Sequence, residues 1–339
     1  MQLILVTALI LYFGRNLFVP MCYGLLIAIV LYPVCKRLER HHWPRSLSIT
    51  AGLLIVFILF SALITLLVIQ ANVLGKDLPE LLNKVDPSLY ELQKWIESCF
   101  GISVNSQNEW KRSALQNFAN NVGNIAQGTI SSAASTLVTL FLVPVYSALF
   151  LYNRGAFVKF LSVIIGKKYH LQLQTILQQV IHTYFNFMKG MALVYLVVGI
   201  LNSVGLMALG IRHAILFGLL TAIMTIIPYV GIIISALLPI SVAWITKDSI
   251  WYPLGVIAVF AFVQYLEANV IFPKIVATQL KVSTWATLVS IIAGGILWGV
   301  SGMILFIPFI GILKIIFDYI PEGKTFNILL GRDEEKVHS

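Results

Sequence analysis

The chain has 339 residues, of which 59% are apolar and only 11% are charged, and its mean hydropathy is +0.90. A soluble protein of this size carries about a quarter of its residues as charges, so the composition argues against a soluble enzyme and against a nucleic-acid-binding module. The formal net charge of +9 therefore informs membrane topology more than it informs the choice of partner.

Charged residues are absent from long stretches of the chain. The uncharged windows are residues 46–75, 113–153, 190–211, 213–246, 249–266 and 282–313. A hydrocarbon core of about 30 Å is crossed by about 20 apolar residues of helix, so several windows can hold a span and some can hold a hairpin. They are continuous apolar blocks, unlike the short alternating segments of a β-barrel. The sequence predicts an all-α polytopic membrane protein.

The distribution of basic residues predicts the topology. Residues 36–45 contain four basic residues and one acidic residue, whereas residues 154–189 contain five basic residues and no acid. Loops rich in Lys and Arg stay in the cytoplasm, so both regions and both termini are expected there. Residues 76–112 carry five basic and six acidic residues, as expected of a translocated region.

The N-terminal unit, residues 1–71, is expected to hold three spans. Their approximate limits are residues 1–17, 18–35 and 47–68. Arg15 lies near the outer end of the first span, where its long side chain can reach the interface.

An extracytoplasmic insertion of amphipathic helices is expected at residues 72–132, before a fourth span at residues 133–153. Its second helix begins near Glu109, and its first helix has apolar residues at helical spacing: Leu78, Leu81, Leu82, Val85, Leu89, Leu92 and Ile96. We interpret the insertion as a packed structural cap; a partner surface or an oligomer contact is the alternative.

A cytoplasmic amphipathic linker is expected at residues 154–189. Its first apolar residues alternate with lysines, which fits a helix at an anionic lipid surface: Phe157, Phe160, Leu161 and Ile164. A second apolar stripe then runs on into a fifth span at residues 191–209. The C-terminal core follows at residues 190–320, and a cytoplasmic tail at residues 321–339.

The first long uncharged window of this core, residues 213–246, exceeds one span. Its middle reads IIPYVG, in which Pro228 breaks the helix and Gly231 permits a turn. No charge marks an emergence into water, so a re-entrant hairpin is favoured, with two full spans as the alternative. The next span, residues 250–272, contains Gln264, Glu267 and Asn269.

A second long window, residues 282–313, is broken around Gly299 and Gly302, again without charge at the turn. Counting the spans gives the two broken pairs opposite topologies. Inverted broken helices are typical of transporters, because irregular backbone within a membrane occurs where it lines a cavity or is buried in protein. The expected architecture is about six full spans plus two inverted broken-helix hairpins, or eight or more helical membrane segments.

The sequence resembles the autoinducer-2 exporter (AI-2E) family of bacterial inner-membrane transporters over nearly its whole length. The resemblance rests on the stretches LFVP, IAIVLYPVCKRLER, WPR, IIPYVG, QYLEANVIFPKIV and AGGILWGVSGMILFIPFIGILK. It implies export of the small polar signal autoinducer-2, as in some members, or sodium–proton antiport, as in others. A homo-oligomer in the bacterial inner membrane is expected.

Glu267 is the strongest candidate for a transport residue, because an ionisable group within a span is costly and is usually functional. A salt bridge to Lys274 is the structural alternative. Gln264 and Asn269 could add neutral hydrogen bonds near it. The other candidates are the residues that would shape the hairpin tips and the polar residues near them, for which a helix kink or a helix–helix hydrogen bond is the alternative: Pro228, Gly231, Gly299, Gly302, Thr225, Asn202 and Ser301.

No catalytic motif is present: the sequence has no HExxH, no P-loop and no Gly-x-Ser-x-Gly. Its three cysteines form no spaced pair, so neither a disulfide framework nor a metal site is expected, and no cofactor is expected. The favoured function is a secondary exporter of a small polar metabolite with H⁺ or Na⁺ as the candidate coupling ion. A monovalent cation/proton antiporter is the first alternative, and a membrane scaffold or assembly protein is the second.

Overall fold

The computed structural model describes residues 2–107, 109, 113, 133–165, 170–228, 230–247, 249–276, 282–320 and 324–331. Throughout these residues the regular elements are helices, and the only strand-like pairing described is an isolated antiparallel bridge between Val282 and Gly331. The predicted all-α class is therefore confirmed.

The N-terminal helices differ from the prediction. α1 (Gln2–Phe13) has 12 residues and α2 (Arg15–Arg40) has 26, with a break at Gly14. At 1.5 Å per residue α1 is about 18 Å long, which is too short for a core of about 30 Å. The residues predicted as the first span, 1–17, therefore do not form one continuous helix, because the helix breaks at Gly14. The second prediction, residues 18–35, lies inside α2.

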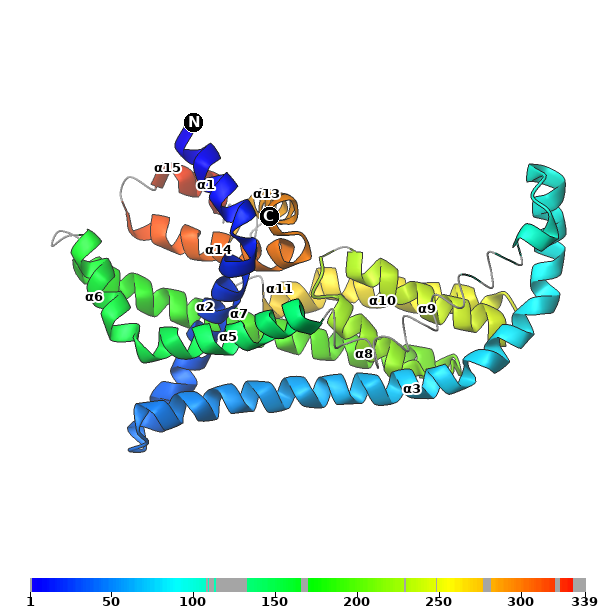
Figure 1. Ribbon diagram of the computed structural model, residues 1–339, viewed down its shortest axis with the longest axis horizontal. Helices are drawn as coiled ribbons and strands as arrows, with labels where there is room; N and C mark the ends of the chain where they lie inside the picture. The colour runs from blue at the N-terminus through cyan, green and yellow to red at the C-terminus, as the bar shows by residue number, and fades with distance from the viewer. Residues whose placement is uncertain are drawn as a thin grey trace.

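α3 (Arg45–Phe100) is one continuous helix of 56 residues, which corresponds to about 84 Å. It runs along the lower edge of the molecule and curves away at its far end (Figure 1). The boundary predicted at residue 72 falls inside this helix, so the third span continues directly into the predicted insertion. The helix ends at Gly101, whose left-handed φ of 69° allows its N–H to bond the Glu97 carbonyl. Most of the insertion's predicted second helix lies outside the described residues.

α5 (Ala133–Tyr152), α6 (Arg154–Ile165) and α7 (His170–Ala208) follow. α5 crosses α2 closely, because Gly24 leaves room for Tyr146, and the Ser147 hydroxyl donates to the Gly24 carbonyl at 2.9 Å. α7 is a single helix of 39 residues, so the predicted run of the linker into the fifth span is confirmed.

The C-terminal half is a series of shorter helices. These are α8 (Ala214–Met224), α9 (Val230–Thr246), α10 (Trp251–Leu266), the π-helix η3 (Glu267–Ile271), α11 (Phe272–Ile275), α13 (Thr284–Trp298), α14 (Val300–Tyr319) and α15 (Lys324–Leu330). α7, α8, α9 and α10 lie alongside one another (Figure 1), and each contacts the next, with α10 returning to α7. These four helices form one bundle around buried residues such as Leu206, Phe217, Val242 and Val256.

A second apolar core forms where α2, α7, α10 and α14 meet. Its buried members include Leu26, Val194, Val198, Val263 and Leu305. Because α7 contributes to both cores and contacts both α8 and α14, it connects the two broken-helix pairs.

Five described helices are long and apolar enough to span a membrane, and six if the bent α5–α6 pair counts as one. α8, α9 and α13 are apolar but shorter than a span, whereas α14 meets the length criterion. The second broken pair therefore has unequal arms, because α13 has 15 residues and α14 has 20. The predicted count of eight membrane segments exceeds the five or six described helices that are long and apolar enough to cross a membrane.

Candidate functional site

The first broken pair turns between α8 and α9. Thr225 follows α8 directly, and its hydroxyl donates to the Thr221 carbonyl at 2.7 Å. Gly231 is needed because of a close approach: a Cβ at this position would lie 1.7 Å from the carbonyl oxygen of Met224. Its φ is not in the left-handed region, so the turn conformation that the sequence suggested for Gly231 is wrong. Pro228 lies in the turn, as predicted, where it interrupts the helix.

The second broken pair turns on a single residue, Gly299, with φ +62° and ψ −142°. This backbone region is essentially restricted to glycine. Gly302 has a different role, because a Cβ there would lie 1.9 Å from the Gly294 carbonyl oxygen. α13 and α14 thus meet backbone to backbone at Gly294 and Gly302, a close packing that small residues permit in membrane helices.

The second turn is held by residues far away in the sequence. The Trp298 indole N–H donates to the Leu11 carbonyl at 2.9 Å, and its ring packs edge-on against Phe306 at 5.5 Å between centroids. The Ser301 hydroxyl interacts with the side chain of Tyr23 on α2. Ser301 therefore connects α14 to α2, which agrees with the helix–helix interpretation of this residue.

Glu267 begins the π-helix η3, six residues before Pro273. Proline lacks an N–H and cannot continue regular hydrogen bonding, and π-bulges are frequent at functional sites. The Glu267 Oε2 atom is buried and has no hydrogen-bond partner. Glu267 and Lys274 are both described, and no ion pair joins them, so the salt-bridge alternative is not supported. A buried acceptor without a partner is costly and is suited to accept a hydrogen bond from a solute or to coordinate a cation.

The packing of α10 against α7 places Glu267 beside Tyr195. Along α7, Gly205 packs on Val259 of α10, and Gly190 packs on Ile275 of α11. In the sequence, Glu267 lies between Val259 and Ile275, and Tyr195 lies between Gly190 and Gly205. The Glu267 and Tyr195 side chains are close enough to interact electrostatically.

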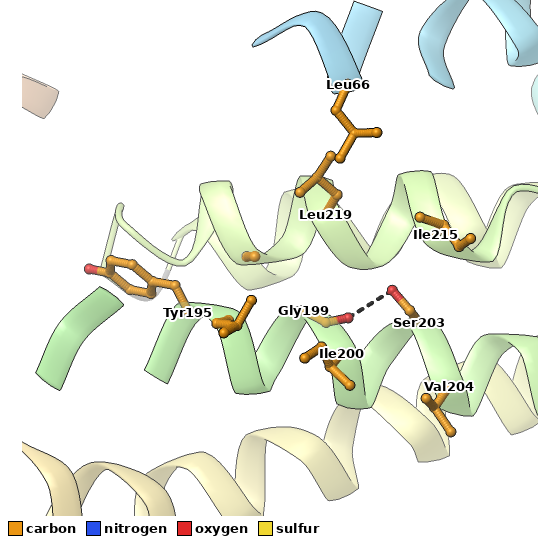
Figure 2. Close-up of a pocket in the computed structure, with 10 residues that line it drawn as sticks. Leu66, Tyr195, Gly199, Ile200, Ser203, Val204, Ile215 and Leu219 are labelled. Atoms are coloured by element: carbon orange, nitrogen blue, oxygen red, sulfur yellow. Dashed lines mark hydrogen bonds between the residues drawn. The ribbon is translucent and has the colours of Figure 1, made fainter. Parts of the chain in front are cut away.

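The turn that follows α8 lies near the part of α7 that contains Tyr195. Gly199 packs against Ala222 of α8, so Thr225, one turn further along this antiparallel helix, is near Tyr195. In Figure 2, Tyr195 lies beyond Leu219, toward the end of α8 where the turn begins. The fold thus places Tyr195 within electrostatic range of Glu267 and toward the end of α8, where the first broken turn begins (Figure 2). The sequence analysis did not select Tyr195, although a tyrosine within the apolar stretch MALVYLVVG is a usable signal.

Asn202 supplies a second buried acceptor in the same bundle. Its side chain is completely buried, its Nδ2 donates to the Val198 carbonyl at 2.9 Å, and its Oδ1 has no partner.

The remaining candidates, Asn269 and Gln264, differ from Asn202 in their exposure. Asn269 is exposed and bonds the Tyr265 carbonyl within its own helix, so it faces away from the buried groups, whereas Gln264 is half-buried.

An apolar groove of about 310 Å³ runs between α7 and α8, beneath Leu66 of α3 (Figure 2). Its lining is almost entirely aliphatic, and the Ser203 hydroxyl in it is already bonded to the Gly199 carbonyl at 2.8 Å. Such a lining suits lipid chains or apolar side chains better than a polar solute. Among the described residues, no three His, Cys, Asp or Glu side chains gather as they would at a metal site.

Comparison with known proteins gives the family. A family described as "AI-2E family transporter" matches residues 1–322. "AI-2 transport protein TqsA" of Escherichia coli is 24% identical over 94% of this chain and 90% of its own length. "Putative transport protein YueF" of Bacillus subtilis is 25% identical over 90% of this chain and 84% of its own length. A "Putative transport protein" of Haemophilus influenzae is 26% identical over 95% of this chain and 92% of its own length. With a match over almost its entire length, the chain belongs to the AI-2E family of transporters.

Proposed function

We propose that the chain is a secondary transporter that exports a small polar metabolite, similar to autoinducer-2, without hydrolysing a nucleotide. The observation that supports this function is the buried Glu267 Oε2 atom, which has no partner and lies where the π-helix η3 begins. Asn202 Oδ1 adds a second buried acceptor without a partner, on α7. A solute rich in hydroxyl groups supplies the donors that both acceptors lack.

The broken helices supply the rest of the site. The turn after α8 interrupts regular helical hydrogen bonding near Tyr195, and backbone groups freed at membrane depth can contact a polar solute. The name of the TqsA relative assigns it transport of autoinducer-2, and that name guides the choice of the first solute to assay.

A monovalent cation/proton antiporter is the second candidate, because Glu267 is a buried carboxyl group that could exchange a proton for a cation. Exchange usually involves a buried acid, and Glu267 is the acid available here in the apolar part of the C-terminal half. Na⁺ or H⁺ could also serve the exporter as a coupling ion.

Purified protein in proteoliposomes separates these functions. Autoinducer-2 efflux without sodium-dependent proton flux supports the exporter, and the reverse supports the antiporter. Absence of both fluxes in correctly inserted protein would contradict transport of either kind and favour a scaffold role.

The variant Glu267→Gln tests the site itself, because glutamine is nearly isosteric and only the titratable charge is lost. A hydrogen bond to a charged group contributes about 1.5–3 kcal/mol, so flux should fall about tenfold or more and lose its pH dependence. Glu97→Gln is the matched control, since Glu97 is exposed near the end of α3. Normal, pH-dependent flux in Glu267→Gln would remove Glu267 from the mechanism.

A further inference from the structure

α6 leaves the direction of α5 abruptly. The two helices are bent by 68° at Asn153. α6 has 12 residues, about 18 Å of helix, so it is too short to cross a core of about 30 Å. A helix of this length that turns sharply at the end of a span is placed to run along the membrane surface.

The bend is held by charged side chains of α2, α3 and α6. Arg154 Nη2 pairs with Glu39 Oε2 at 2.5 Å, and its guanidinium carbon lies 5.3 Å from the centre of the Tyr32 ring. Arg45 Nη2 donates to the Leu151 carbonyl at 2.9 Å and thereby caps the C-terminus of α5. Because α2, α3 and α5 all contribute, the angle of α6 is set by the fold.

Within the described part of the chain, most of the apolar face of α6 is uncovered. None of its residues is buried. Phe157, Phe160 and Ile164 are spaced so that they share one face, and they are 44%, 61% and 63% exposed. The Phe157 ring packs against Phe150 of α5 with 5.2 Å between the ring centroids, whereas Phe160 and Ile164 are mostly exposed. Lys159 and Ser162 lie on the opposite side of the helix.

The charges around α6 indicate what covers this face. No acidic residue occurs between Glu109 and Asp248, whereas Lys159 lies on α6 and Lys167 and Lys168 follow it in the sequence. Exposed apolar side chains combined with a purely basic flank match a bilayer surface that carries anionic headgroups. An apolar partner groove would not require this charge bias.

We propose that α6 is a membrane-interface helix that inserts Phe157, Phe160 and Ile164 into the cytoplasmic leaflet, with anionic phospholipid headgroups bound by Lys159 and by the lysines that follow the helix in the sequence. The bend and its ion pair then fix the end of α5, and through α7 the C-terminal bundle, to the lipid surface. This inference does not depend on which solute the protein moves.

Spin labels in the full-length protein test the proposal. In a background lacking Cys22, Cys35 and Cys99, single cysteines replace Phe160 and Ile164, and matched controls replace Lys159 and Ser162. The protein is placed in nanodiscs of phosphatidylcholine alone or of an equal mixture with phosphatidylglycerol. Labels at 160 and 164 should collide with oxygen more than with a water-soluble nickel complex, at a depth of about 5–10 Å, and labels at 159 and 162 should show the reverse preference.

The charge component has its own control. With Lys159, Lys167 and Lys168 all changed to Gln, the label at 164 should become shallower in the anionic mixture and match its depth in phosphatidylcholine. If the depth of the label at 164 is the same in both lipid mixtures before the lysines are changed, the proposed binding of anionic headgroups is wrong. Labels at 160 and 164 that both reagents fail to reach would show a protein partner or a second copy, and strong nickel access would show water; either result overturns the proposal.

Discussion

Replacing Gly302 with alanine should separate α13 from α14. The new Cβ would lie 1.9 Å from the Gly294 carbonyl oxygen, and ordinary contact begins at 3.4 Å, so the helices must move apart by about 1.5 Å, the difference between these distances. The nearest atoms are backbone atoms of Gly294, which cannot rotate away as a side chain would. Forcing extra volume into packed helices costs about 1–3 kcal/mol.

Thermal unfolding of purified, detergent-solubilised protein measures this cost, and flux in proteoliposomes measures its effect on transport. Gly302→Ala should lower the unfolding midpoint by several degrees and reduce flux, because the turn at Gly299 and the Trp298 contact move with the helices. Gly52→Ala is the matched control: its Cβ would meet Cys35 Sγ at an ordinary 3.4 Å, so little change is expected. Equal unfolding midpoints for Gly302→Ala, Gly52→Ala and the unmodified protein would refute the close backbone crossing.

Three further predictions address the rest of the fold. Arg154→Gln should destabilise the protein by about 1 kcal/mol, since this partly exposed pair is screened by water, and adding Glu39→Gln should recover part of that loss in thermal unfolding. Trp298→Phe removes the bond to the Leu11 carbonyl, so proteolysis of α1 should accelerate while that of α3 is unchanged; equal α1 cleavage in both proteins would contradict the contact. A cysteine at Lys84 should react with an impermeant thiol reagent in intact cells, and labelling only after permeabilisation would reverse the predicted topology.

The position of the broken turns followed from local sequence, but the reason for several glycines did not. The interruptions around Pro228 and Gly299 are visible because a proline or a glycine stands in an otherwise unbroken apolar window. Only the structure distinguishes Gly299, which needs its positive φ, from Gly231 and Gly302, which need the space that a backbone carbonyl occupies. Both needs exclude a side chain, and sequence alone cannot tell one from the other.

The same division applies to the candidate site. Glu267 could be selected from sequence, because an acid within an apolar span is rare and expensive. Its neighbours could not, because Tyr195 lies 72 positions away by the numbering and reaches it only through the way α10 packs on α7. The predicted partner Lys274 is close in sequence, yet the π-helix η3 and the packing of α11 leave the two charges unpaired.

By itself, the sequence determined that this is a helical membrane protein, because the partition of apolar residues into a bilayer depends on composition within a window of about 20 residues. The tertiary structure alone decided that α1 stops at Phe13, that α3 continues for 56 residues without a break, and that two helix pairs meet on α7. Helix ends and crossings depend on contacts between residues far apart in the chain, such as Trp298 with Leu11. A hydropathy window cannot contain those contacts, and only the folded chain supplies them.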